Sequence, residues 1–145
     1  MAHAATEIAR AAADLTEAFN DSDFERARSM CTPDVAYNET GTGRRVEGLD
    51  AYTDLLKGWK QALPDVRGAI RGSLADDDTV VQDILWEGTH TGPIQTPTGT
   101  IEATGNRVSV QGTIWVTFEN EKVREVHHHL DVLSLLQQTG ALPAG

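Results

Sequence analysis

Residues 122–143 read KVREVHHHLDVLSLLQQTGALP, a stretch that combines a strand pattern, three adjacent histidines and a carboxylate with a short amphipathic tail. A strand places successive side chains on opposite faces. His127, His129 and Asp131 would therefore share one face of a strand that ends at Asp131, and His128 would lie on the other face. The stretch predicts a final strand whose end carries a group of polar side chains.

The turn before this strand decides which of its two faces is buried. A two-residue turn at 120–121 would pair Ile114 with His127, because the turn of a hairpin fixes the register of its strands. The two alternating histidines and Asp131 would then lie on the apolar face, and we expect His128 at the surface. The sequence thus predicts polar groups that face the core.

Upstream of this stretch, the hydrophobic pattern has a helical period first and a period of two afterwards. The expected helices cover 4–20, 22–30 and 49–63, and the expected strands cover 34–38, 66–74, 80–90, 108–118 and 123–131. Three aspartates at 76–78 are expected to form a hairpin turn. This order indicates an α+β fold, with N-terminal helices packed on one face of a strongly curved antiparallel sheet.

Length and composition narrow the possible partners. A chain of 145 residues is of ordinary size for one domain. Its formal charge of −10 repels nucleic acid and anionic lipid, and no apolar run is long enough to predict a membrane span. Cys31 is the only cysteine, which fits a reducing compartment. We therefore expect a cytoplasmic protein without nucleic-acid or membrane partners.

The polar residues at the end of the last strand suggest acid/base chemistry. A carboxylate that faces an apolar core has a raised pKa unless it is paired, and such a carboxyl group can exchange protons near neutral pH. Asp131 is therefore a candidate general acid/base, with His129 and His127 to orient it or relay its proton. Asp is also a preferred N-cap, so Asp131 could instead begin the tail, and both roles could hold together.

Metal and cofactor sites find little support in the sequence. The H-x-H pair of His127 and His129 could bind a metal only if a further ligand, such as His90, converged on it. No nucleotide, flavin or metalloprotease motif is present. We predict no metal and no cofactor.

A ligand pocket is suggested by aromatic residues and by a long connection that follows the stretch WEGTHTG at 86–92. Long loops in compact domains often act as lids. His90 ends the core-facing row of its strand and would approach the mouth of the pocket. The residues expected to contact a small hydrophobic molecule are His90, Trp86, Tyr37, Asn38, Tyr52, Trp59, Ile114 and Val116.

The motifs GTHTG at 88–92, PTG at 97–99 and D-x-x-x-LLQQ-x-G-x-LP at 131–143 resemble those of SnoaL-like polyketide cyclases, which belong to the nuclear transport factor 2-like superfamily. The resemblance covers nearly the whole chain. It implies one SnoaL-like domain over 1–145, a cone-shaped α+β barrel with a deep pocket, and a homo-oligomer, either a dimer or a tetramer. This chain departs from its relatives in having three histidines before the aspartate, where they more often have aromatic or apolar residues.

The resemblance also implies a reaction, in which an aspartate catalyses an intramolecular aldol condensation of a polyketide-like ketone or ester without metal or cofactor. That aspartate corresponds to Asp131, so Asp131→Asn would abolish turnover. A hydrolase or hydroxylase on the same scaffold is one alternative. A pocket that binds small molecules without catalysis, or a dimerisation module, is a second alternative, and a metal enzyme is a third. We expect an enzyme of the lyase or isomerase type.

Overall fold

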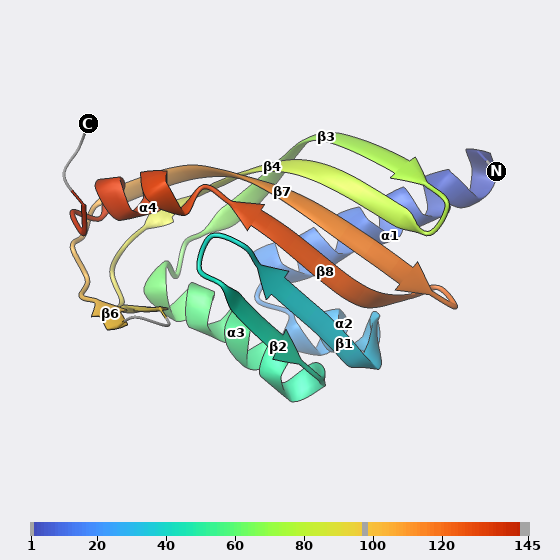
Figure 1. Cartoon of the computed structure of the whole chain (residues 1–145), viewed down its shortest axis with the longest axis horizontal. Coiled ribbons are helices and arrows are strands. Elements are labelled where there is room, and N and C mark those ends of the chain that lie inside the picture. The colour runs from blue at the N-terminus through green and yellow to red at the C-terminus, as the bar shows by residue number, and fades with distance from the viewer. Residues whose placement is uncertain (1, 97–98, 143–145) are drawn as a thin grey trace.

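The structure is a computed structural model that describes residues 2–96 and 99–142 (Figure 1). Its helices are α1 (Ala2–Asn20), α2 (Phe24–Ser29), α3 (Leu49–Ala62) and α4 (Val132–Gln138). Its strands are β1 (Cys31–Glu39), β2 (Arg44–Glu47), β3 (Arg67–Asp76), β4 (Thr79–Thr89), β5 (Ile94–Thr96), β6 (Gly99–Ile101), β7 (Arg107–Glu119) and β8 (Lys122–Leu130). No helix of the described residues is long and apolar enough to cross a membrane.

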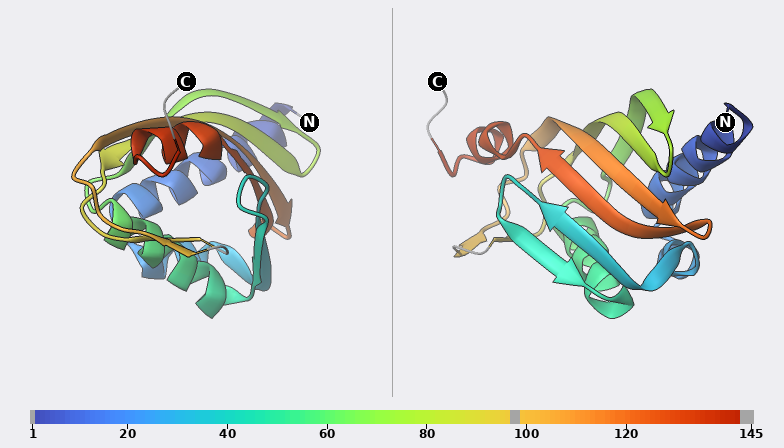
Figure 2. Two further views of the ribbon diagram at one scale, coloured as in Figure 1. Left: turned by 60° about the vertical axis from the view of Figure 1, so that its left-hand side comes forward. Right: turned by 45° about the vertical axis from the view of Figure 1, so that its right-hand side comes forward.

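Six of the strands form one curved sheet in the order β2-β1-β8-β7-β4-β3. Neighbouring strands are antiparallel except β1 and β8, which are parallel. The sheet bends around α1 and α3, which lie along its inner face, and α4 lies at one end (Figure 2). The predicted α+β fold, with helices packed on a strongly curved sheet, is confirmed.

The helices pack on the sheet through apolar stripes, and a buried pair of hydrogen bonds from one side chain, called the clamp below, joins α1 to β3. In α1, Leu15 and Phe19 are buried one turn apart, as the helical period requires. Asn20 ends this helix and bonds both backbone groups of Gly68 in β3: its Nδ2 donates to the carbonyl oxygen at 3.0 Å, and its Oδ1 accepts from the N–H at 2.8 Å. This clamp fixes the end of α1 against β3.

A β-bulge between β7 and β8 changes the predicted register. The turn at Asn120 and Glu121 forms as expected, with φ of 49° and 67°, and Phe118 pairs with Val123. Thr117 then pairs with Glu125, so Arg124 is one extra residue in β8. One extra residue sends every later side chain to the opposite face.

The face predicted for the polar residues of β8 was therefore wrong. His128 pairs with Ile114 and is buried, at 6% exposure. His127 pairs with Trp115, whose side chain is 47% exposed on the outer face. His129 is exposed on that same outer face. The bulge at Arg124 is the physical cause of this exchange.

The long connection after β4 contains a small hairpin of β5 and β6. Its first residues are tied to the end of α3, because the N–H groups of Thr91 and Gly92 donate to the carbonyl oxygen of Ala62 at 3.1 and 3.0 Å. Ile94 is buried, at 2% exposure, and faces α3 residues such as Trp59 across a second cavity. The hairpin thus packs beside α3.

Candidate functional site

An apolar cavity of about 100 Å³ lies between the helices and the inner face of the sheet. The hydrophobic period of each element dictates its position, because α1, α3 and the inner rows of β4, β7 and β8 all turn their apolar side chains toward one another. Six residues expected from the sequence to form the pocket line this cavity: Tyr37, Tyr52, Trp59, Trp86, Ile114 and Val116.

Two residues expected in the pocket do not line it. His90 is fully buried, but its Nδ1 lies 2.9 Å from Oγ1 of Thr104, and it is not part of the cavity wall. Asn38 follows Tyr37 in β1 and so points to the opposite face, where its Oδ1 accepts a hydrogen bond from Arg45. Direct contacts of His90 and Asn38 with a molecule in this cavity are therefore not supported by the structure.

Asp131 caps α4 at the surface, as the alternative interpretation predicted. Its Oδ1 accepts from the N–H of Ser134 at 3.1 Å, and its Oδ2 accepts from Oγ of Ser134 at 2.6 Å. The side-chain and backbone hydrogen bonds from Ser134 lower the pKa of Asp131, so the raised pKa expected for a core-facing carboxylate was wrong. Asp131 does not line the cavity.

His127 and His129 form a stacked pair outside the barrel. Their ring centroids are 4.8 Å apart and their planes differ by 20°. Nδ1 of His129 lies 3.0 Å from Oγ1 of Thr40. Within residues 2–96 and 99–142, no group of three His, Cys, Asp or Glu side chains is placed to hold a metal.

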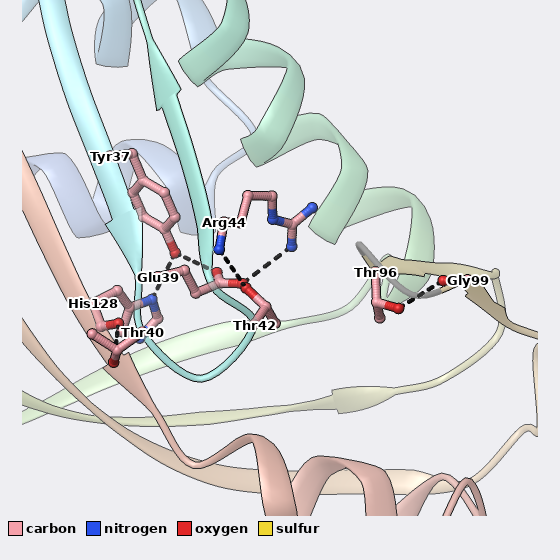
Figure 3. Close-up of polar contacts among 8 residues, drawn as sticks. All are labelled: Tyr37, Glu39, Thr40, Thr42, Arg44, Thr96, Gly99 and His128. Carbon is pink, nitrogen blue, oxygen red and sulfur yellow. Dashed lines mark hydrogen bonds and ion pairs between the residues drawn. The ribbon is translucent and has the colours of Figure 1, made fainter.

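Five buried or half-buried side chains form a continuous hydrogen-bonded chain that ends in the cavity wall (Figure 3). The hydroxyl of Tyr37 donates to Oε2 of Glu39 at 2.6 Å and lies 2.8 Å from Nδ1 of His128. The other carboxylate oxygen of Glu39 accepts from Arg44 at 3.1 Å and from Thr42 at 2.7 Å. Alternation along β1 places Tyr37 and Glu39 on the same face, toward His128 of the neighbouring strand.

The charges along this chain follow from its contacts. Burial alone would raise the pKa of Glu39, but hydrogen bonds from Tyr37 and Thr42 and the charge of Arg44 lower it below its ordinary value. Burial and the neighbouring Glu39 raise the pKa of Tyr37 well above its usual range. Glu39 is therefore a carboxylate and Tyr37 is a neutral phenol at neutral pH.

The protonation of His128 follows from the single hydrogen of the Tyr37 hydroxyl. Because that hydrogen is donated to Glu39, the hydroxyl oxygen must accept from Nδ1–H of His128. Burial lowers the pKa of His128 to about 4, so the ring is neutral near pH 7. A neutral ring protonated at Nδ1 has a bare Nε2, and this atom is buried without a partner among the described residues.

Sequence reasoning missed His128 and Glu39 as members of the site. One signal was available for His128, since Val123 and Val126 are both apolar although an odd spacing puts them on opposite faces of a regular strand. For Glu39, the signal was its place two residues after Tyr37 in an expected strand.

Comparison with known proteins agrees with this architecture. A family model for the SnoaL-like polyketide cyclases matches residues 9–139. No match was found among curated proteins.

Solved structures from several bacteria share the fold. AclR, a hydroxylase candidate from Streptomyces galilaeus, has a TM-score of 0.82 and 24% identity, over 97% of this chain and 85% of its own. A SnoaL-like polyketide cyclase candidate from Jannaschia sp. CCS1 has a TM-score of 0.84 and 18% identity, over 95% of this chain and 94% of its own. A ketosteroid isomerase candidate from Kribbella flavida has a TM-score of 0.67 and 14% identity, over 87% of this chain and 78% of its own. Since the family model spans nearly the whole chain, the protein belongs to the SnoaL-like polyketide cyclase family.

Proposed function

We propose that this protein is a cofactor-independent acid/base enzyme that acts on a small hydrophobic ketone or ester, with His128 as the base. One observation carries the proposal: Nε2 of His128 is an unprotonated, buried nitrogen without a partner among the described residues, on a side chain that lines an apolar cavity. Membership of the family supports a cyclase that closes a ring by intramolecular aldol condensation.

In this mechanism, Nε2 of His128 removes a proton from a carbon next to a carbonyl group, and the resulting enolate attacks a second carbonyl carbon of the same molecule. The imidazolium donates from Nδ1 to Tyr37, which in turn donates to the carboxylate of Glu39, so the positive charge gains a nearby counterion. Because burial lowers the pKa of His128, the imidazolium readily returns its proton to the new alkoxide. His128 thus takes the role predicted for Asp131.

Hydrogen exchange at the carbon next to a carbonyl tests the first step without knowledge of the natural substrate. We expect the wild-type protein to exchange these hydrogens of single-ring aryl ketones in D2O faster than buffer does, as followed by proton NMR. His128→Asn should lower the rate by about 10²- to 10⁴-fold, the usual contribution of a positioned acid or base.

His129→Asn is the matched control, because it makes the same change one residue away on the outer face and should leave the rate unchanged. Exchange that survived in His128→Asn would contradict the proposal. For a natural substrate, product mass separates the alternatives, because cyclisation adds no atoms whereas hydrolysis or hydroxylation adds oxygen.

A further inference from the structure

A second unpartnered nitrogen lies close to Nε2 of His128. Nε1 of Trp86 is buried without a hydrogen-bond partner among the described residues. A Cβ atom added to Gly112 of β7 would lie 2.5 Å from Nε2 of His128 and 3.2 Å from Nε1 of Trp86. Both nitrogens therefore lie within 3.2 Å of one point above Gly112. Gly112 has no side chain to separate them, and the side chains of Trp86 and His128 both line the cavity.

The orientation of the Trp86 indole is fixed by its neighbours. Gly68 of β3 leaves room for the ring, since a Cβ there would lie 2.5–2.9 Å from three of its carbon atoms. The Phe19 ring meets the indole edge-on, with centroids 5.4 Å apart and planes at 88°. Asn20 in turn holds Gly68 by two hydrogen bonds. The indole nitrogen is thus held on the His128 side of the barrel, where the two ring centroids are 5.9 Å apart.

The two nitrogens have complementary chemistry. Nε1 of Trp86 can only donate a hydrogen bond, and Nε2 of His128 in its neutral form can only accept one. Leaving both unpaired inside a protein is unfavourable, because neither regains the hydrogen bond it makes to water in the unfolded chain. A ligand that offers an acceptor oxygen next to an acidic hydrogen would satisfy both atoms.

We propose that Trp86 and His128 form a carbonyl-recognition site, in which Nε1–H of Trp86 donates to the carbonyl oxygen and Nε2 of His128 faces a hydrogen on the adjacent carbon. This inference rests on the proposed role of His128 as base. When the C–H bond breaks, its proton forms an N–H bond at Nε2, and its electron pair moves to give an enolate oxygen. The hydrogen bond from Trp86 strengthens as that charge develops, which lowers the barrier.

The chemistry of this site selects one class of substrate, apolar ketones or esters with at least one hydrogen on the carbon next to the carbonyl. The part of the molecule that enters the cavity should be no larger than one ring, since an apolar cavity of about 150 Å³ holds benzene and this one is smaller, at about 100 Å³. Hydrocarbons of the same shape should bind less well, because they leave the indole N–H unpaired.

Binding of acetophenone and isopropylbenzene, which have similar shapes but differ in the carbonyl group, tests the site. We expect acetophenone to shift the indole N–H resonance of Trp86 downfield in proton–nitrogen NMR spectra, and isopropylbenzene to leave the resonance without a downfield shift. Trp86→Phe should lower acetophenone affinity about three- to tenfold relative to isopropylbenzene, the usual effect of one neutral hydrogen bond. It should also slow hydrogen exchange about 100-fold, as the loss of an oxyanion donor does.

Trp115→Phe is the matched control, because it makes the same change at a tryptophan that lies on the outer face and does not line the cavity. It should leave the preference for the ketone unchanged. Gly112→Ala would place a methyl group 2.5 Å from Nε2 of His128 and 3.2 Å from Nε1 of Trp86, and should abolish acetophenone binding in a protein that still unfolds cooperatively.

The outcomes separate this inference from the proposed function. The carbonyl site would be overturned if acetophenone did not shift the indole N–H resonance of Trp86, or if Trp86→Phe still bound acetophenone in preference to isopropylbenzene. Either result would count even if the wild-type protein catalyses hydrogen exchange. A downfield shift without exchange would instead support the carbonyl site and contradict the catalytic role of His128.

Discussion

At the scale of single residues, the buried His128 makes the stability of the protein depend on pH. Its pKa is about 4 in the folded protein and about 6.5 in an unfolded chain, so the unfolded state binds more protons between these values. The free energy of unfolding should be highest above pH 6.5 and should fall as the pH drops toward 4. The expected loss is about 3–4 kcal/mol, from a pKa difference of about 2.5 units at about 1.4 kcal/mol each.

Urea unfolding of the wild type and of His128→Asn between pH 4.5 and 7.5 measures this effect. The other titratable groups are the same in both proteins, so the difference between the two stability curves isolates His128. The curves should converge as the pH falls, because only the wild type loses the contribution of a neutral imidazole. Parallel curves would show that the pKa of His128 is not lowered by folding.

At the scale of elements, Asp131 should contribute to the stability of α4 and not to catalysis. Its carboxylate accepts two hydrogen bonds from Ser134 at the start of this helix. Asp131→Ala should lower the free energy of unfolding by about 1 kcal/mol, the usual value of an N-cap, while Asp131→Asn should keep most of it. Thermal unfolding gives this difference, and hydrogen exchange of aryl ketones should stay at the wild-type rate in both variants. Loss of exchange in Asp131→Asn would restore the acid/base role first predicted for this residue.

The elements also show why the sequence predicted the pocket but not its polar residues. The aromatic and aliphatic lining followed from periodicity, because Tyr52 and Trp59 lie on one stripe of α3, and Trp86 lies in the inner row of β4. The polar residues depended on register, which one bulge at Arg124 inverted. A bulge is an irregularity in how two strands pair, so the hydrophobic pattern of β8 alone indicates it only weakly.

At the scale of the whole molecule, the fold could be predicted because several local signals agreed. Helical periods came before strand periods, and turn residues separated the strands, so one α+β arrangement satisfied all of them. The parallel pairing of β1 with β8 was not predicted, because it joins strands about 90 residues apart and no local pattern specifies it. That pairing brings Tyr37 and Glu39 beside His128, and so the site itself is a product of the global fold.

The same pairing buries the only cysteine, which makes its reactivity a measure of global unfolding. Cys31 begins β1 opposite Val123 of β8 and is 6% exposed, and burial raises the pKa of its thiol to about 12. Since the thiolate is the reactive form, a thiol reagent should not label the native protein at pH 8 but should label one group per chain after unfolding. A ligand that binds only the folded cavity should slow labelling, by about 100-fold at a concentration 100 times its Kd. Acetophenone should give this protection in the wild type and less of it in Trp86→Phe, as followed by the absorbance of the released reagent. Fast labelling without denaturant would show that the junction of α2 and β1 opens locally, independently of the cavity.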